Sequence, residues 1–382
     1  MSYRAYVSSV SYYSGKLEAY LRYAEIPHER IEVNSKMLRE TLLPATGFMK
    51  VPTLQCPDGR WLKDTTPMIR WLDQQHGRPS IYPADPANCF MALLVEDYAD
   101  EWLWRPAMYY RWNFADSHRL LRHRLGRDLS AGTLHPAGLL GWFMRWRQYL
   151  IYVRGDGVTR KNEGEIQALY ARTLQQLSAL LTTRPYLLGE RPSIVDFGYF
   201  ASMFRHFALD PHSAEIMVNT APAVYAWVAR VWNARARAES HSSLEDFADP
   251  AWDAVFSELG RDYLAYLDAN AKAYARGEQR FDLWLGETCY PRMPVVRYRV
   301  ACREQLLKAW QALPASVQVS VSQRLETSGI SHWLATAVAI PSGLDAEFIM
   351  PLAQHYPSAR GWYGLKLLQG TPWDMPKPAI KP

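Results

Sequence analysis

Four consecutive hydroxyl-bearing residues stand near the start of the chain: Ser11, Tyr12, Tyr13 and Ser14. They follow an apolar, β-rich stretch and precede a segment with helical spacing, so their hydroxyl groups are expected at a helix N-terminus. There the helix dipole and a hydroxyl hydrogen bond would stabilise a thiolate, the form in which a thiol is a nucleophile. Ser14 could instead serve only as the helix N-cap.

Val51 and Pro52 form a second candidate site at the start of an expected strand. Proline cannot donate a hydrogen bond within a sheet, so it belongs at an edge or at a special turn. The backbone N–H and C=O of the preceding residue can then pair with a peptide-like ligand, as an added strand would. Val51 is therefore a candidate ligand-binding residue through its backbone.

Asp64 and Thr65 precede the start of another expected helix. The unpaired N–H groups and the positive end of the helix dipole favour a carboxylate there, so a free α-carboxylate of a ligand could dock. The alternative is that Thr65 or Thr66 only caps the helix.

The elements that position these residues follow the order β-α-β and then β-β-α. Pro27 ends the first helix, Pro57-Asp58-Gly59 suits a tight turn between two strands, and Gly77 closes the last helix. This order predicts an α+β, thioredoxin-like domain in residues 1–82. The expected elements are a strand (3–10), a helix (14–24), strands (30–33, 51–54 and 60–62) and a helix from residue 67 to residue 77.

Residues 78–87 carry three prolines and indicate a linker. Beyond them apolar residues recur at helical spacing without a convincing strand, which predicts an all-helical bundle in residues 88–240. Aromatic residues are dense near its start, and such a wall suits an apolar electrophile, although a bundle core or a dimer interface would use it equally well. These substrate-pocket candidates are Trp104, Tyr109, Tyr110 and Trp112, together with Tyr12 and Tyr13.

Residues 246–382 form a C-terminal extension that we expect to be mostly helical. It opens with a helical stripe through Phe256, Leu259, Tyr263 and Leu267. Residues 317–321 fit either a strand or a helix, because periodicity cannot decide at that length. The proline-rich residues after 370 are expected to be extended.

These features together resemble the glutathione S-transferase superfamily over about 240 residues. Val51-Pro52, Asp64-Thr65 in place of the family's Glu-Ser, and a bundle signature in residues 189–197 stand in the family's order. In that signature Ser193 and Asp196 read as a capping box that serves folding. The resemblance implies a cis Pro52, a homodimer, and glutathione as co-substrate. It also implies a glutathione site formed by Lys50, Val51, Pro52, Asp64 and Thr65.

The same resemblance implies a transferase that attacks an apolar small-molecule electrophile with the glutathione thiolate. In serine-type members the activating residue lies five positions before the basic residue of helix one, and counting back from Lys16 gives Ser11 as the catalytic candidate. Tyr12 and Tyr13 are close alternatives. Residues 16–27 also resemble the metaxin and failed-axon-connections branch, which implies a non-catalytic interaction protein as the competing function.

The composition of the chain argues against several other classes of protein. The formal charge of +5 is a mild excess that we interpret as spread along the chain, which predicts no nucleic-acid partner. The basic residues 118–127 are interpreted as a solvated helix face. Four separated cysteines without a Cys-x-x-Cys pair predict reduced thiols and no metal. Without an N-terminal leader or a long apolar run, we expect no membrane span and a cytoplasmic location.

Overall fold

The computed structural model of the protein describes residues 2–77, 79–238 and 243–352. Within these residues the N-terminal part is a mixed sheet with the strand order β2-β1-β3-β4. β1 and β2 are parallel, whereas β3 pairs antiparallel with both β1 and β4. This confirms the predicted thioredoxin-like order. The strands are β1 (Tyr3–Val7), β2 (His28–Glu32), β3 (Thr53–Gln55) and β4 (Trp61–Lys63).

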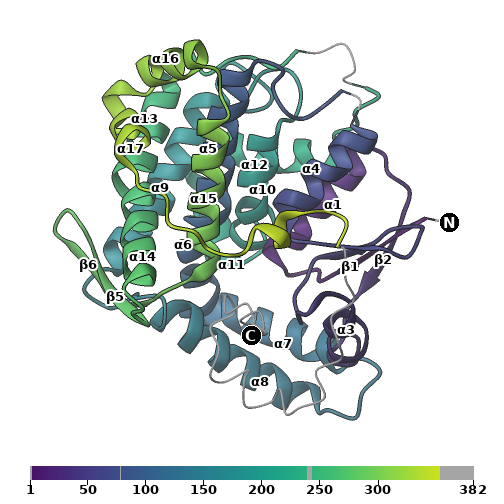
Figure 1. Ribbon diagram of the computed structural model, residues 1–382. Helices are drawn as coiled ribbons and strands as arrows, with labels where there is room; N and C mark the ends of the chain where they lie inside the picture. Colours follow the sequence, from purple (N-terminus) through teal and green to yellow (C-terminus); the bar gives the residue numbers. More distant parts are fainter. Residues whose placement is uncertain (1, 78, 239–242, 353–382) are drawn as a thin grey trace, which may run out of the picture.

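Helix α1 (Tyr12–Tyr23) lies between the sheet and the helical part of the molecule (Figure 1). It contacts α4 (Thr65–His76) on one side and the bundle helices α10 and α12 on the other. Almost every residue of α1 is buried, as expected for a helix that is covered all round. The connection from β2 to β3 consists of α2 (Ser35–Met37), a π-helical turn (Leu38–Leu42) and α3 (Leu43–Thr46).

The following helices confirm the expected bundle. Its central helix α10 begins with the predicted capping box: the backbone N–H of Ser193 donates to Asp196 Oδ2 at 2.9 Å, while the Ser193 side chain accepts from the backbone. Asp196 Oδ1 also accepts from Trp227 Nε1 at 2.9 Å, which ties α10 to α12. The helices are α5 (Pro86–Glu101), α6 (Trp104–Asn113), α7 (Ala115–Ser130), α8 (Ala137–Gln148), α9 (Glu163–Leu180), α10 (Ile194–Ser202), α11 (Pro211–Thr220) and α12 (Pro222–Asn233), with π-helical turns at Tyr149–Arg154 and Met203–Phe207.

The described part of the extension is mostly helical, as predicted, and packs along the bundle. α15 and α16 both contact α5, and α13 contacts α9 (Figure 1). The helices are α13 (Ala251–Glu258), α14 (Ala265–Ala275), α15 (Arg297–Gln311), α16 (Ala315–Arg324) and α17 (Ile330–Thr336), with a π-helical turn at Leu259–Leu264 and 3-10 turns at Glu326–Ser328 and Asp345–Phe348.

Two features of the extension refine the sequence-based expectations. Residues 317–321 belong to α16, so the helical alternative is correct. A hairpin of β5 (Arg280–Leu285) and β6 (Thr288–Pro294), which was not predicted, turns at Gly286 with φ 57°. The segment after residue 370 lies outside the described residues. The boundaries at residues 82, 88, 240 and 246 stay predictions, since a single hydrophobic core joins the sheet, the bundle and the extension.

Candidate functional site

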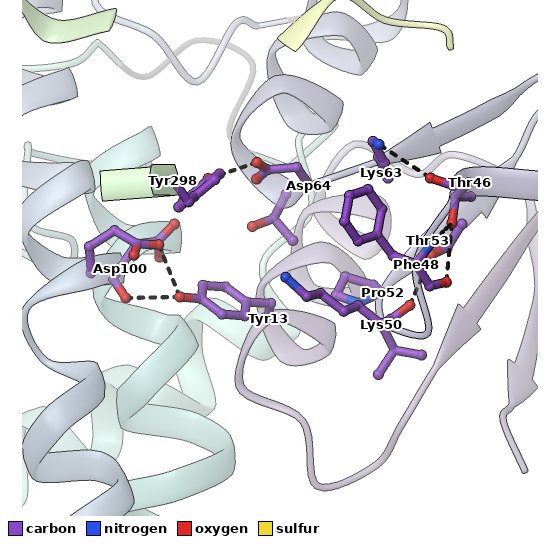
Figure 2. Close-up of a pocket in the computed structure, with 13 residues that line it drawn as sticks. Tyr13, Thr46, Phe48, Lys50, Pro52, Thr53, Lys63, Asp64, Asp100 and Tyr298 are labelled. Carbon is purple, nitrogen blue, oxygen red and sulfur yellow. Dashed lines mark hydrogen bonds between the residues drawn. The ribbon is translucent and has the colours of Figure 1, made fainter. Parts of the chain in front are cut away.

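A cavity lies where the edge of the sheet meets α5 and α15 (Figure 2). Its volume is about 100 Å³, which is below the roughly 300–1,000 Å³ of typical ligand pockets. Five parts of the chain contribute to its wall. The residues that line it are Tyr13, Thr46, Phe48, Lys50, Val51, Pro52, Thr53, Lys63, Asp64, Thr65, Asp100, Glu101 and Tyr298.

Asp64 stands at the N-cap of α4 with φ 68°, so its backbone is in the left-handed region that side chains rarely adopt. Its side chain makes no capping hydrogen bond and instead accepts from the Tyr298 hydroxyl at 2.7 Å. Burial raises the pKa of Asp64, while the Tyr298 hydrogen bond and the charge of Lys16 oppose the rise. Asp64 thus occupies the N-cap position of α4 without capping it through its side chain, and because α4 begins at Thr65, the alternative of a Thr65 or Thr66 cap is wrong.

Val51 and Pro52 join through the cis peptide bond that the family resemblance implied. Both residues line the cavity. Among the described residues the backbone N–H and C=O of Val51 make no hydrogen bond, so they are able to pair with a ligand backbone.

Two lysines bring positive charge to the same wall. Lys63 is buried and its ammonium donates to the carbonyl of Thr46 at 3.2 Å while lying 4.1 Å from the centre of the Phe48 ring. The ammonium of Lys50 lies 5.3 Å from the same ring, and Figure 2 shows its side chain extending from the sheet side toward Tyr13. An anionic group in the cavity would therefore meet two ammonium groups.

Of the predicted cluster of hydroxyl-bearing residues, the structure places Tyr13 in the cavity wall and the others outside it. Tyr13 reaches the cavity, where its hydroxyl contacts Glu101 Oε1 at 3.0 Å and the carbonyl of Asp100 at 3.2 Å. Burial, helped by the neighbouring Tyr12 and Asp100, raises the pKa of Tyr13 well above its usual value, so this phenol stays protonated.

Ser11 and Tyr12 are not among the described residues that line the cavity. Ser11 is the N-cap of α1, and its Oγ accepts from the backbone N–H of Ser14 at 3.3 Å, so the cap expected at Ser14 belongs to Ser11. Tyr12 is buried and donates to the carbonyl of Ala99 at 2.8 Å. Of the two residues, only Ser11 has its hydroxyl at the N-terminus of α1.

The predicted aromatic wall is also divided. Trp104 stacks on Tyr13 with ring centroids 6.0 Å apart and an interplanar angle of 14°. Tyr109, Tyr110 and Trp112 are buried, and Tyr110 packs on Tyr170 of α9 at 4.9 Å. Their placement favours the bundle-core alternative for these three residues, whereas Trp104 borders the cavity through Tyr13.

A buried ionic cluster that the sequence did not predict extends from the α5 wall of the cavity, which Asp100 and Glu101 line. Lys16 of α1 pairs with both Glu96 and Asp100 of α5, and Arg299 of α15 pairs with Glu101. Burial alone would lower the pKa of Lys16, but the two carboxylates outweigh it and raise that pKa. A partial signal was available in the sequence, because Glu96, Asp100 and Glu101 recur at helical spacing, beside Asp97, in a helix whose other residues are mostly apolar.

Three further absences hold for the described residues: a metal-holding group, a disulfide and a membrane-spanning helix. No group of three or more His, Cys, Asp or Glu side chains is arranged to hold a metal ion. All four cysteines are free, and burial raises the pKa of Cys56 to about 11 and that of Cys302 well above its usual value. In the part of the chain that is described, no helix combines the length and the apolar character that crossing a membrane requires.

The fold is a small mixed sheet followed by a helical bundle, with a cavity between them. Two family models match this chain: the glutathione S-transferase N-terminal domain over residues 10–75 and the glutathione S-transferase C-terminal domain over residues 160–230. The chain therefore belongs to the glutathione S-transferase superfamily. The N-terminal match spans Ser11, Val51 and Asp64, and neither match includes Tyr298 or α8.

Solved structures with similar architecture include a glutathione S-transferase from Rhodospirillum rubrum F11 (17% identity, 60% of this chain and 87% of that chain, TM-score 0.40). Another is the β-etherase from Sphingobium sp. strain SYK-6 (17% identity, 60% and 95%, TM-score 0.42). A third is a glutathione S-transferase from Methylobacterium radiotolerans in complex with glutathione sulfonate (17% identity, 65% and 99%, TM-score 0.39). No curated protein matches the chain.

Proposed function

We propose that the cavity binds glutathione, with the backbone of Val51 pairing with the cysteinyl residue and with Asp64 and Thr65 holding the γ-glutamyl end. The observation that carries this proposal is that these groups, on separate elements, open onto one cavity. The Asp64 carboxylate suits the ligand's ammonium group, and the start of α4 at Thr65 suits its α-carboxylate. Lys50 suits an anionic group such as the thiolate or the glycyl carboxylate.

We further propose that the bound thiolate attacks an apolar electrophile. Ser11 is the candidate for stabilising the sulfur, because its hydroxyl stands at the N-terminus of α1, where the helix dipole favours a negative charge. Tyr13 is the alternative, because its hydroxyl lines the cavity. The stacked pair of Tyr13 and Trp104 offers an aromatic surface to the electrophile. The expected homodimer stays a prediction.

A second candidate function is that of a non-catalytic interaction protein with the same fold. Two observations favour it. The cavity is small, and the Tyr298 hydroxyl already donates a hydrogen bond to Asp64, the residue proposed to hold the ligand's ammonium group. In this function the extension would keep the cavity closed. The two candidates differ in whether glutathione binds and reacts.

An activity measurement separates the two candidates. Under the transferase proposal, the full chain mixed with glutathione and an activated aryl chloride forms the thioether faster than glutathione alone, and chloride release measures the rate. Removing Lys50 as Lys50→Met is expected to lower the rate, and Lys36→Met, which changes an exposed lysine outside the cavity, is expected to leave it unchanged. A rate no greater than that of glutathione alone, over a series of apolar electrophiles, would favour the non-catalytic function.

A further inference from the structure

The outer face of α8 carries the largest apolar side chains of that helix. Leu139, Trp142, Phe143, Trp146 and Leu150 are all exposed, with exposed fractions from 38% to 65%. At 3.6 residues per turn their spacing places them on one face, running from α8 into the turn that follows it. Trp142 and Trp146 touch at 6.2 Å between ring centroids, so the apolar face is continuous.

On the opposite face of α8, Gly141 is the one residue of the helix that is buried, and it packs against α7. A Cβ at Gly141 would lie 2.2 Å from the carbonyl oxygen of Arg122, and one at Gly126 would lie 2.2 Å from the carbonyl oxygen of Ala137. The backbones of α7 and α8 are therefore in direct contact. This packing places Gly141 on the inside and leaves the tryptophans outside, the reverse of an ordinary surface helix.

The same helix pair carries the positive charge of the chain. Residues 115–154 contain seven arginines against two aspartates, with no lysine or glutamate, so their formal charge of +5 equals that of the whole chain. The interpretation of an evenly spread charge is thus wrong. Arg145 and Arg147 flank the apolar face of α8, and the guanidinium of Arg145 lies 4.1 Å from the Trp146 ring.

An apolar face bordered by arginines matches the chemistry of a bilayer surface. Acyl chains accept leucine and phenylalanine, tryptophan prefers the level of the lipid headgroups, and arginine pairs with lipid phosphates. A second copy of the chain fits less well, because it would bring two surfaces of charge +5 together. α8 also lies at the lower edge of the molecule in Figure 1, with α7 between it and the bundle.

We propose that this surface, the apolar face of α8 with the arginines of residues 115–154, docks the protein on an anionic membrane. The helix lies in the plane of the headgroups without crossing the bilayer. The inference does not rest on the proposed function, because the surface is separate from the cavity and uses none of its residues.

Cosedimentation with lipid vesicles tests the proposal. The full chain is expected to bind vesicles of phosphatidylglycerol and phosphatidylcholine in equal parts, and to bind pure phosphatidylcholine vesicles at least about tenfold more weakly. Added salt weakens the binding, because the phosphates are then screened. The double variant Trp142→Gln/Trp146→Gln is expected to lose roughly tenfold or more in affinity. Arg119→Gln/Arg127→Gln, which removes two exposed arginines of α7, is expected to lose a similar factor.

Matched controls come from outside this surface. Trp284→Gln removes a tryptophan that is 64% exposed on the β5–β6 hairpin, and Arg160→Gln removes an exposed arginine; both are expected to bind as the unchanged protein does. Absence of binding to the mixed vesicles overturns the proposal, as does equal binding by the α8 variant. A dimer in solution that dissociates in Trp142→Gln/Trp146→Gln also overturns it, since the face would then join two copies.

Discussion

Tyr298 and Asp64 are separated by 234 residues in the chain, yet the Tyr298 hydroxyl donates to the Asp64 carboxylate at 2.7 Å. If Asp64 holds the ammonium group of glutathione, the two donors compete for the same oxygen. Tyr298→Phe is then expected to tighten glutathione binding roughly three- to tenfold, since a hydrogen bond to a charged group is removed only from the unliganded state. Calorimetric titration measures the change.

The control for this substitution lies in the same extension. Tyr274 donates to the carbonyl of Ser342 at 3.5 Å, away from the cavity, so Tyr274→Phe is expected to bind glutathione as the unchanged protein does. Weaker binding by Tyr298→Phe would contradict the competition, because the hydroxyl would then contact the ligand.

Single substitutions also decide whether Ser11 or Tyr13 stabilises the thiolate. If Ser11 stabilises the thiolate, Ser11→Ala is expected to lower kcat about tenfold and to move the pH profile of the reaction to higher pH, as the thiol pKa rises. Tyr13→Phe would leave both unchanged. Tyr12→Phe is the control, because this hydroxyl is buried against the carbonyl of Ala99.

Because Ser11 also caps α1, Ser11→Ala should lower the free energy of unfolding by about 1 kcal/mol, which a denaturant titration measures separately. An unchanged pH profile in Ser11→Ala, with the shift appearing instead in Tyr13→Phe, would assign the role to Tyr13.

At the scale of elements, α5 determines a pH dependence of stability. Burial raises the pKa of Asp97 to about 6, with a smaller opposing effect of the Tyr263 hydroxyl at 2.6 Å. In the unfolded chain Asp97 loses its proton at a pH of about 4, whereas in the folded state the carboxyl keeps the proton up to a pH of about 6. Because the folded state binds the proton more tightly, Asp97 lowers the stability of the fold as the pH rises through this range. Asp97→Asn removes that loss, which amounts to about 3 kcal/mol.

Urea unfolding of the two proteins at several pH values measures the difference. Relative to the unchanged protein, Asp97→Asn should gain stability as the pH rises through this range. Asp58 behaves oppositely, because its hydrogen bonds with Arg60 lower its pKa, so Asp58→Asn should give a difference of the other sign. A difference between Asp97→Asn and the unchanged protein that does not vary with pH would contradict the role of Asp97.

The close packing of α7 against α8 gives a second prediction at the scale of elements. Gly141→Ala places a methyl group 2.2 Å from the carbonyl oxygen of Arg122, so the helices must separate, and the free energy of unfolding is expected to fall by roughly 1–3 kcal/mol. Gly138→Ala in the same helix meets nothing within 4 Å and is expected to be neutral or slightly stabilising. Thermal unfolding compares the two, and equal stability would contradict the close packing.

At the scale of the whole molecule, sequence and structure agree where local patterns decide. Pro57-Asp58-Gly59 and Gly77 marked the turn and the helix end of the thioredoxin-like part, and Ser193 with Asp196 marked the start of α10. The β5–β6 hairpin was not recognised, although residues 280–285 alternate between exposed and buried before Gly286. The helical stripe from Phe256 to Leu267 indicated the helical start of the extension, whereas the way the extension packs on the bundle had no local signal.

The site was predicted on the side formed by residues 50–65 and, from α1, at Tyr13. Val51, Pro52, Asp64 and Thr65 line the cavity as a group because the sheet and α4 carry them. Tyr298 and Arg299 were not predictable, because contacts across two hundred residues leave no periodic or spacing signal in one sequence. The partners of the α5 carboxylates, Lys16 and Arg299, are thus identified only when three distant segments are packed together.

Calorimetric titration with glutathione tests the central claim, that the cavity is a glutathione site built around Asp64, most directly. The unchanged protein is expected to bind, Asp64→Ala to bind at least about tenfold more weakly because the ligand's ammonium group loses its carboxylate, and Asp58→Ala, an exposed turn residue, to bind as the unchanged protein does. Absence of binding at millimolar glutathione, or equal affinity in Asp64→Ala, would contradict the claim.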